Sequence, residues 1–465
     1  MNKTIKRFFK TSGIFLIGNA LSKIITFLLL PLYTNYISTT DYGYYDLSVT
    51  YVTVLTSMLY FDIWATALRF LYETQDQNKR NQIITICWFL FSISSVLFLG
   101  IGAIFCNKMS IAHGAMILGY GLSVNLYNMS SFMARGQEKN VDFVVSGIIN
   151  TVFMVVSNLV MILGMHMDIE ALYSSAIIGN LAQFAYLSIR ASVLPKLQGF
   201  QFNQILLREI VHYTLPLCVN SVSYWFLTSY NRTIVEDIMG LSANGIYAIG
   251  NKFGAAISIV TTCFIYAWQS IAFARQKDSK ADGAFYGKAS GQYFLFLGLG
   301  VAGLLPFFHI TFPLLIGKSY ADAYDTIPIF LIMAVLSACS TFVGNIFYAI
   351  KDTRSIFSSM IISSLCNILL CRFLVVRFGI NGANASICIS FALNIGIRYL
   401  ILARRIAIKH NRWHYLIPLI VISIATAVYT SKLLILNIAL IFGMVVAIII
   451  VLFWLRKKQV ERVSA

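Results

Sequence analysis

Charged residues, and acidic ones above all, are scarce in this chain. Only 11% of its 465 residues are Asp, Glu, Lys or Arg, and 18 acidic residues stand against 35 basic ones. Soluble domains carry about 25% charged residues, so a soluble globular protein is excluded. Moreover, 58% of the chain is hydrophobic, and no polar stretch is long enough for a separate soluble domain. This composition is typical of a protein that crosses the membrane many times.

The motifs of several functional classes are also missing. The chain has no glycine-rich phosphate-binding loop, no Ser/His/Asp order, and no CxxC or Cys/His spacing of a metal site. Its six histidines are scattered, and its eight cysteines fall within or at the ends of apolar runs, where they fit as small apolar fillers. We therefore expect no enzyme activity, no cofactor and no metal. A secondary carrier is favoured over an ATP-driven pump, unless a separate subunit supplies the motor.

Apolar runs of about 20 residues recur along the whole chain, with short polar joints between them. They predict an all-α polytopic membrane protein of about fourteen transmembrane helices. The first run follows a basic tail but is longer than a signal-peptide core, so we expect it to remain as a span. The predicted ranges are roughly 11–34, 43–71, 82–105, 113–133, 142–164, 169–189, 211–235, 243–272, 286–311, 325–349, 355–376, 382–402, 414–430 and 434–455.

The basic residues, which give a formal net charge of +17, are unevenly spread. Most lie in the two tails and in alternate joints, whereas the opposite joints hold Lys108, Lys318, Arg377 and Lys432. By the positive-inside rule, both termini are predicted to be cytoplasmic, which fits an even number of helices. This distribution indicates membrane topology and argues against binding to nucleic acid.

Two echoes along the chain indicate an internal duplication. Gly43 and Tyr45, after the first helix, match Gly245 and Tyr247, after the seventh. A second echo, between the joints after helices four and ten, gives the same six-helix step. Many transporters consist of two such related bundles around a site at the midplane. We predict two pseudo-symmetric six-helix lobes, residues 1–200 and 201–405, followed by two additional helices and a cytoplasmic tail in residues 406–465.

Charged residues inside the predicted spans are mostly basic. A charge at the bilayer centre costs about 2.5 to 3.5 kcal/mol, so such residues normally face an aqueous cavity or a partner. A cavity with unbalanced positive charge suits an anionic cargo, and we interpret the chain as a transporter of a substrate that carries phosphate or a similar group. The six basic residues are Lys23, Arg69, Arg232, Lys252, Arg372 and Arg398, against the acidic Asp46 and Asp62.

The first predicted helix carries a polar stripe that includes Asn19 and Lys23. Lys23 lies near the middle of the span, where its stem reaches neither headgroup layer comfortably, so it has the strongest claim to the cavity. The alternative is a lysine held by helix-end carbonyls or by an acid on the second helix.

Gating residues are predicted on the second helix, which places Asp62, Arg69 and Glu73 on one face. A charged cluster suits an inner gate, because ion pairs in a low-dielectric site strongly favour one arrangement over another. Arg69 and Glu73 equally fit side chains that snorkel to the interface. Asp46 lies near the other end, where an outer-gate or packing role is as reasonable as contact with the cargo.

The seventh and eighth predicted helices repeat this polar theme. Pro216 removes a backbone donor and permits a bend between inward-open and outward-open forms. The eighth helix aligns several polar residues on one face, as expected of a wall that faces water, although polar helix packing is an alternative. Arg372 and Arg398 lie near span ends, where snorkelling is the favoured interpretation. The candidate cavity residues on these two helices are Asn220, Tyr224, Arg232, Asn251 and Lys252.

The run LPLYTNYISTTDYGYYDL from Leu30 to Leu47, followed by Ala67-Leu-Arg69-Phe70, resembles the opening of bacterial polysaccharide repeat-unit (Wzx-type) flippases. These belong to the multidrug/oligosaccharidyl-lipid/polysaccharide exporter (MOP) superfamily. The resemblance implies a V-shaped pair of lobes in the bacterial cytoplasmic membrane that opens alternately to each side. It also implies an undecaprenyl-diphosphate-linked oligosaccharide as cargo, for capsule, O-antigen, teichoic or exopolysaccharide assembly, with glycosyltransferases and a polymerase as possible partners.

This resemblance implies a cationic cavity, in which Lys23 and other buried bases replace the hydration of the diphosphate. Tyr224, Asn251 and Tyr348 are expected to contact sugar hydroxyls, while the lipid tail stays among the membrane lipids. A multidrug/cation antiporter and a lipid II flippase of the same superfamily are the alternatives. The former usually carries acids in its cavities and the latter uses buried arginines, whereas the first helix here offers Lys23. A glycan polymerase would need larger outer loops, and a scaffold would tolerate loss of the buried charge.

Overall fold

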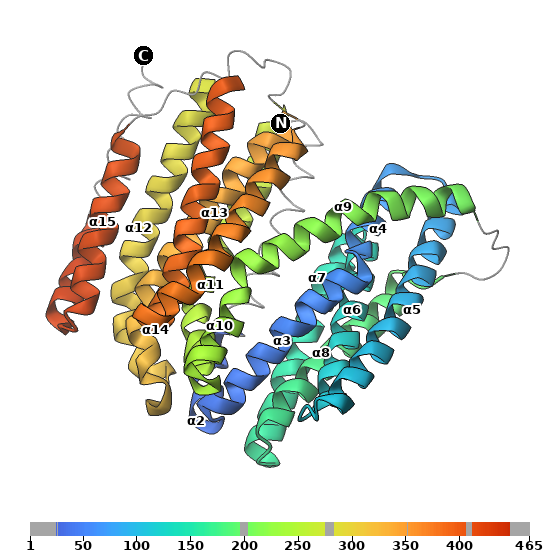
Figure 1. Ribbon diagram of the computed structural model, residues 1–465, viewed down its shortest axis with the longest axis horizontal. Coiled ribbons are helices and arrows are strands. Elements are labelled where there is room, and N and C mark those ends of the chain that lie inside the picture. Colours follow the sequence, from blue (N-terminus) through green and yellow to red (C-terminus); the bar gives the residue numbers. More distant parts are fainter. Residues whose placement is uncertain are drawn as a thin grey trace, which may run out of the picture.

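The computed structural model of the chain describes residue 25 and residues 27–195, 203–274, 283–350, 352–405 and 412–446. Within these ranges the labelled helices run from α2 to α15 along the chain, and there is no strand (Figure 1). The all-α fold predicted from the recurring apolar runs is therefore confirmed.

The first group of helices, which we call the N-bundle, extends from α3 to α8 (Figure 1). Its core is apolar and includes Tyr60, Leu71 and Ile86. The helix α3 begins where Ser38 accepts a hydrogen bond from the backbone N–H of Asp41 at 3.0 Å, an ordinary N-cap. The helices are α3 (Thr39–Tyr60), α4 (Ile63–Glu73), α5 (Gln77–Lys108), α6 (Gly114–Gly136), α7 (Asn140–Leu159) with its π-helical end η1 (Val160–Gly164), and α8 (Ile169–Arg190).

The second group, the C-bundle, extends from α10 to α15 (Figure 1). Its core is larger and includes Phe308 and Ile346. A shorter apolar helix, Leu434–Val446, follows α15. The helices are α10 (Tyr230–Met239), α11 (Leu241–Ala274), α12 (Gly283–Leu315), the 3₁₀ helix η3 (Lys318–Thr326), α13 (Ile327–Ala349), α14 (Thr353–Arg405) and α15 (Trp413–Thr430).

The long helix α14 consists of two membrane passes joined at Gly379. At about 1.5 Å per residue, its 53 residues would far exceed the thickness of a bilayer. Gly379 has φ 56° and ψ −138°, which breaks the helix. Asn394 donates to the carbonyl of Ser359 at 3.0 Å, and Ser386 donates to Asn367 at 2.8 Å, so the two arms lie antiparallel. These arms correspond to the predicted spans 355–376 and 382–402.

A second break divides the predicted span 43–71 into α3 and α4. Phe61 and Asp62 both adopt left-handed backbone conformations, with φ of 52° and 51°. The two helices are bent by 51° at this point. The sequence gives no signal for this break, because neither residue is a glycine or a proline, the residue types that usually interrupt a helix.

Six helices of the described part are long and apolar enough to cross a membrane, or up to seven if the bent pair α3–α4 is one span. The helices α6 and α8 are not among them, and they carry many Ser, Asn and Tyr residues. Both helices line the interior cavity described below, so their polarity is explained by what they face.

The segment before α3 and the helix α9 connect the two bundles. The helix α2 (Leu30–Tyr36) packs on the C-bundle, where Gly317 donates its backbone N–H to Thr34 at 2.9 Å. The helix α9 (Gln204–Thr228) crosses from one bundle to the other (Figure 1). Its Thr214 hydroxyl lies 3.0 Å from that of Thr66 on α4. Its far end packs on α14 of the C-bundle.

The two bundles meet at one end and diverge towards the other, which gives the molecule a V shape (Figure 1). We call the meeting point the closed end; it is formed by residues 37–46 together with the start of α11, Arg232 on α10 and Tyr320 on η3. The hydroxyls of Thr39 and Ser242 lie 2.7 Å apart. Asn244 donates to the carbonyl of Gly43 at 2.8 Å, and Tyr320 donates to that of Ser38 at 2.9 Å.

Candidate functional site

A cavity of about 920 Å³ lies between the bundles, which we call the central cavity. Residues of α3, α6, α7 and α8 line it from the N-bundle, and residues of α11 and α12 line it from the C-bundle. Phe27, Leu28 and Tyr33, in and just before α2, contribute near the closed end. The volume is within the usual range for small-molecule sites, about 300 to 1,000 Å³.

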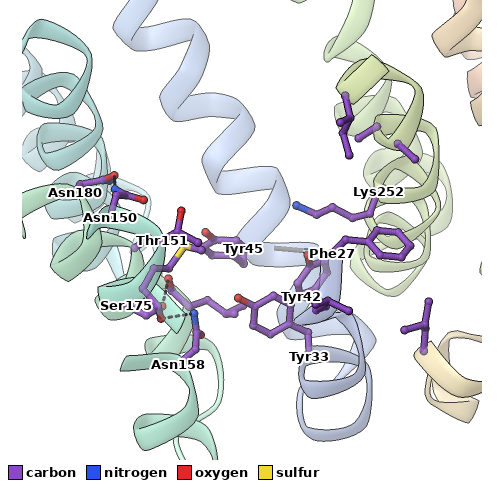
Figure 2. A pocket seen from close by; sticks show the side chains of 18 of the residues that line it. Phe27, Tyr33, Tyr42, Tyr45, Asn150, Thr151, Asn158, Ser175, Asn180 and Lys252 are labelled. Atoms are coloured by element: carbon purple, nitrogen blue, oxygen red, sulfur yellow. Dashed lines mark hydrogen bonds between the residues drawn. The ribbon is translucent and has the colours of Figure 1, made fainter. Parts of the chain in front are cut away.

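Lys252 on α11 is the one charged residue among the described residues that line the central cavity. Figure 2 shows its amino group extending from α11 into the space between the bundles. Lys252 forms no ion pair with the residues that the structure describes, whereas the nearby Asp46 is paired with Arg232. This position, predicted from sequence, therefore presents an ammonium group to the cavity.

The opposite wall of the central cavity is built from amides and hydroxyls of α7 and α8 (Figure 2). Asn150 donates to Asn180 at 3.0 Å, and Asn180 donates to Ser123 at 3.1 Å, so these amides hold one another in place. Asn158 and Ser175 lie further along the same wall. We call this surface the amide wall. None of these side chains carries a charge. Because amides and hydroxyls donate and accept hydrogen bonds, this surface can bind a cargo that carries hydroxyl groups.

Tyrosine rings cover the cavity towards the closed end. The rings of Tyr42 and Tyr45 are 6.2 Å apart, and Tyr45 lies 5.0 Å from Tyr173 and 6.3 Å from Tyr120. Tyr33 lies 5.9 Å from Tyr42. These rings were not among the predicted site residues, although the high density of tyrosine in residues 33–45 is a signal for them in the sequence.

A second cavity of about 540 Å³, the side pocket, lies within the C-bundle on the other side of α11. Tyr224 on α9, Arg232 on α10 and Asn251 on α11 all line it, together with several Ser and Thr residues. Neighbouring residues on a helix point about 100° apart. Asn251 therefore faces the side pocket, whereas Lys252 faces the central cavity.

Arg232 and Asp46 form an ion pair that joins the bundles at the closed end. Arg232 Nε lies 2.6 Å from Asp46 Oδ2, and the two side chains are 12% and 19% exposed. The guanidinium also lies over the ring of Tyr247, 5.4 Å from its centre. Arg232 was predicted as a cavity residue and Asp46 as a gating residue; in the structure the two are paired with each other, and Arg232 also lines the side pocket.

The predicted gating residues of the second span make two separate sets of contacts. The Asp62 carboxylate accepts a hydrogen bond from Ser221 of α9. Arg69 pairs with Glu73 at 2.9 Å, with both side chains more than half exposed, and lies over the ring of Tyr213. The structure thus does not bring Asp62 into the Arg69–Glu73 pair.

The other predicted site residues either lie outside the described part of the chain or line neither cavity. Asn19 and Lys23 lie outside the described residues, as does the side chain of Tyr348. Asn220 and Pro216 lie on α9 and line neither of the two cavities.

Two further arginines behave differently from each other. Arg372 lies at the surface, paired with Asp237 at 2.9 Å. Arg398, interpreted from sequence as a snorkelling side chain, is only 2% exposed. It donates to the Ser359 hydroxyl at 3.0 Å and to the Ser340 carbonyl at 2.6 Å. This corrects the interpretation: polar partners within the C-bundle, which a single sequence does not reveal, hold the guanidinium in place.

Two helical bundles around a shared cavity define the architecture of a membrane transporter. The model of the family described as polysaccharide biosynthesis protein matches residues 8–268. The chain belongs to this family, and the resemblance found in residues 30–70 is confirmed at that level. No curated protein matches the chain in sequence.

Solved structures of the MOP superfamily share the fold. The lipid II flippase MurJ, in an inward closed conformation, is 14% identical with a TM-score of 0.73, over 94% of this chain and 99% of that one. An inward-facing multidrug resistance MATE family transporter of the MOP superfamily is 10% identical with a TM-score of 0.69, over 82% and 95%. An outward-facing MATE transporter is 12% identical with a TM-score of 0.57, over 86% and 94%.

Proposed function

We propose that this protein flips an undecaprenyl-diphosphate-linked oligosaccharide repeat unit across the bacterial cytoplasmic membrane by alternating access. Lys252 is the observation that carries the proposal: it has no ion-pair partner among the described residues, it is the one charge in the described lining of the cavity, and it lies opposite the amide wall. An ammonium group binds phosphate through charge-assisted hydrogen bonds. Amides and hydroxyls bind sugars, and membership of a polysaccharide biosynthesis family supports a glycan cargo.

The charge pattern of the joints supports an orientation for this transport. By the positive-inside rule both termini are cytoplasmic, and the joint between the first two helices then lies on the outer side. The closed end would therefore face outwards, and the cavity would open towards the cytoplasm. In this scheme the lobes 1–200 and 201–405 move against each other, and the helices in 406–465 accompany the second lobe.

The chemistry of the cargo defines the reactions on either side. A glycosyl transfer to a lipid diphosphate must supply the repeat unit on the cytoplasmic side. A polymerisation must consume it on the outer side. Glycosyltransferases and a polysaccharide polymerase are therefore the partners that we propose.

The two alternative cargoes fit the described cavity less well. A multidrug/cation antiporter needs an accessible carboxylate, but no acid is among the described residues of the central cavity. The nearby Asp46 is already neutralised by Arg232. A lipid II flippase would be expected to use arginines, and the described lining contains Lys252 and no arginine.

Reconstituted vesicles can test the proposal directly. The probe is a fluorescent undecaprenyl-diphosphate-linked saccharide whose movement between leaflets is measured by quenching from one side. Loss of a charge-assisted hydrogen bond costs about 1.5 to 3 kcal/mol, so Lys252→Gln should slow flipping at least about tenfold, and Lys252→Arg should retain most of it.

A surface lysine provides the matched control. Lys432 is 61% exposed and pairs with Asp325 at 3.1 Å, so Lys432→Gln should leave flipping unchanged. Undiminished flipping by Lys252→Gln would contradict the proposal. Export of a cationic drug by both the wild-type protein and Lys252→Gln would favour the antiporter instead.

A further inference from the structure

The Asn158 side chain on the amide wall has an acceptor that nothing in the described part of the chain satisfies. Asn158 is 1% exposed and lines the central cavity. Its amide nitrogen donates to the carbonyl of Met154 at 3.0 Å. Its oxygen Oδ1 has no hydrogen-bond partner among the described residues. If the positions of Oδ1 and Nδ2 were exchanged, Oδ1 would face the carbonyl oxygen of Met154, and the two oxygens would repel each other. The contact with Met154 therefore determines which side-chain atom is the oxygen.

Ser175 presents a second acceptor on the same wall. Its hydroxyl donates its proton to the carbonyl of Leu172 at 3.2 Å, which leaves the oxygen lone pairs available. The side chain is 1% exposed, lines the central cavity and lies near Asn158 (Figure 2). This part of the amide wall therefore offers acceptors to whatever enters the cavity.

A buried acceptor without a donor is unfavourable by about 1 to 3 kcal/mol, and a ligand that supplies the donor recovers this free energy. Ionised phosphate has only acceptors and cannot do so. Sugar hydroxyls and the N–H groups of N-acylated sugars are donors. The amide wall is therefore matched to the glycan part of a phosphate-linked cargo and mismatched to its phosphate.

Lys252 has the opposite character, because an ammonium group donates hydrogen bonds and accepts none. Figure 2 shows Lys252 and Asn158 on opposite sides of the pocket, on α11 and on the α7–α8 side respectively. The part of the cavity that the structure describes is thus polarised, with a cationic donor on the C-bundle and neutral acceptors on the N-bundle.

We infer that the cargo binds crosswise, with its phosphate on Lys252 of the C-bundle and its first sugar donating a hydrogen bond to Asn158 on the N-bundle. This inference rests on the proposed function and adds the orientation of the cargo and the source of its selectivity. A lipid diphosphate without sugar contacts one bundle only. A glycosylated lipid contacts both, so it alone links the two bundles that move against each other during transport.

Binding measurements with two probes test this inference. The purified full-length protein, in lipid nanodiscs, is titrated with undecaprenyl diphosphate and with undecaprenyl diphosphate that carries one N-acetylhexosamine. One hydrogen bond to a buried acceptor corresponds to about tenfold in affinity, so the wild-type protein should bind the glycosylated probe about tenfold more tightly. Asn158→Leu should remove this preference and leave the affinity for the sugar-free probe unchanged. Lys252→Gln should weaken both probes equally.

Asn125 offers a matched control for the leucine substitution. It is a fully buried asparagine of α6 in the same bundle, but it does not line the central cavity. Asn125→Leu should change neither affinity. Equal binding of both probes by the wild-type protein would overturn the crosswise orientation without any variant. Weakening of both probes by Asn158→Leu would overturn it as well. No binding of either probe would instead overturn the proposed function, and this inference with it.

Discussion

Gly43 on α3 and Gly245 on α11 meet backbone to backbone at the closed end. A Cβ atom added to Gly43 would lie 1.9 Å from the carbonyl oxygen of Leu241, and one added to Gly245 would lie 2.0 Å from that of Thr39. Real Cβ atoms do not approach backbone atoms so closely. The absence of side chains at these two positions thus allows the bundles to close, and the two glycines are the pair that the echo in the sequence matches.

Gly43→Val should shift the protein towards a form that is open at this end. The added side chain cannot fit against α11, so the state in which the two helices separate is favoured. Spin labels at the exposed positions Ser110 and Lys318, in a chain without native cysteines, would report the separation of the two bundles. We expect a longer label distance for the variant than for the parent chain.

Gly147→Val on α7 is the control for the change in helix propensity alone. A Cβ at Gly147 would meet no atom within 4 Å. This variant should keep the parental label distance. A parental distance in Gly43→Val as well would show that the glycine contact does not govern closure.

The Asp46–Arg232 pair should stabilise the same closed end. Removing one partner leaves the other charge mostly buried and unpaired, which costs about 3 to 5 kcal/mol for a fully buried pair and less at this exposure. Asp46→Asn should lengthen the distance between the labels at Ser110 and Lys318 and lower the thermal unfolding midpoint. The exchanged double variant Asp46→Arg/Arg232→Asp should recover part of both losses.

A second Arg–Asp pair provides the comparison. Arg372 and Asp237 also join two helices, at 2.9 Å, but are 67% and 51% exposed. Exposed pairs contribute about 0 to 1 kcal/mol, so Asp237→Asn should change neither measurement appreciably. Equal effects at Asp46 and Asp237 would be inconsistent with a special role for the buried pair.

Much of the fold was predictable because membrane spans are dictated by hydrophobic length. Most predicted ranges in the described part correspond to one helix each, including both arms of α14, whereas 43–71 is divided between α3 and α4 and 211–235 between α9 and α10. The matching of Gly43 with Gly245 was also visible in the sequence. That the two glycines touch each other was not, because an internal repeat shows equivalence and says nothing about contact.

The candidate site was predictable only in part. Lys252 was found because a charge within an apolar run is conspicuous. Asn158 and Ser175 were missed because an uncharged polar residue in a span is equally consistent with helix packing. The burial of Arg398 was missed because its partners Ser340 and Ser359 come from other helices, which a single sequence cannot bring together.

The break between α3 and α4 predicts an unusual response at Phe61. Its left-handed φ of 52° is unfavourable for a bulky residue and more so for a β-branched one. A non-glycine residue in this conformation costs about 1 to 3 kcal/mol, so Phe61→Gly should preserve or raise the thermal unfolding midpoint, while the β-branched Phe61→Val should lower it. Measurement of the midpoint in detergent distinguishes the two. A more stable Phe61→Val than Phe61→Gly would mean that the break is absent.

Tyr320→Phe should loosen the closed end without disturbing either bundle. The hydroxyl donates to the backbone carbonyls of Ile37 at 3.1 Å and Ser38 at 2.9 Å, and the ring itself is fully buried in η3. Losing this donor costs about 1 kcal/mol, which corresponds to about a fivefold change in the ratio of closed to open molecules. Tyr60→Phe is the matched control, because its hydroxyl donates to Ser95 at 3.0 Å within the N-bundle.

Both tyrosine variants should lower the thermal unfolding midpoint slightly, since each loses a hydrogen bond. Only Tyr320→Phe should enlarge the population with a long distance between the labels at Ser110 and Lys318, because only its partners lie on the segment that joins α2 to α3. The same distance distribution in both variants would show that the η3 contact packs the segment without holding the bundles together.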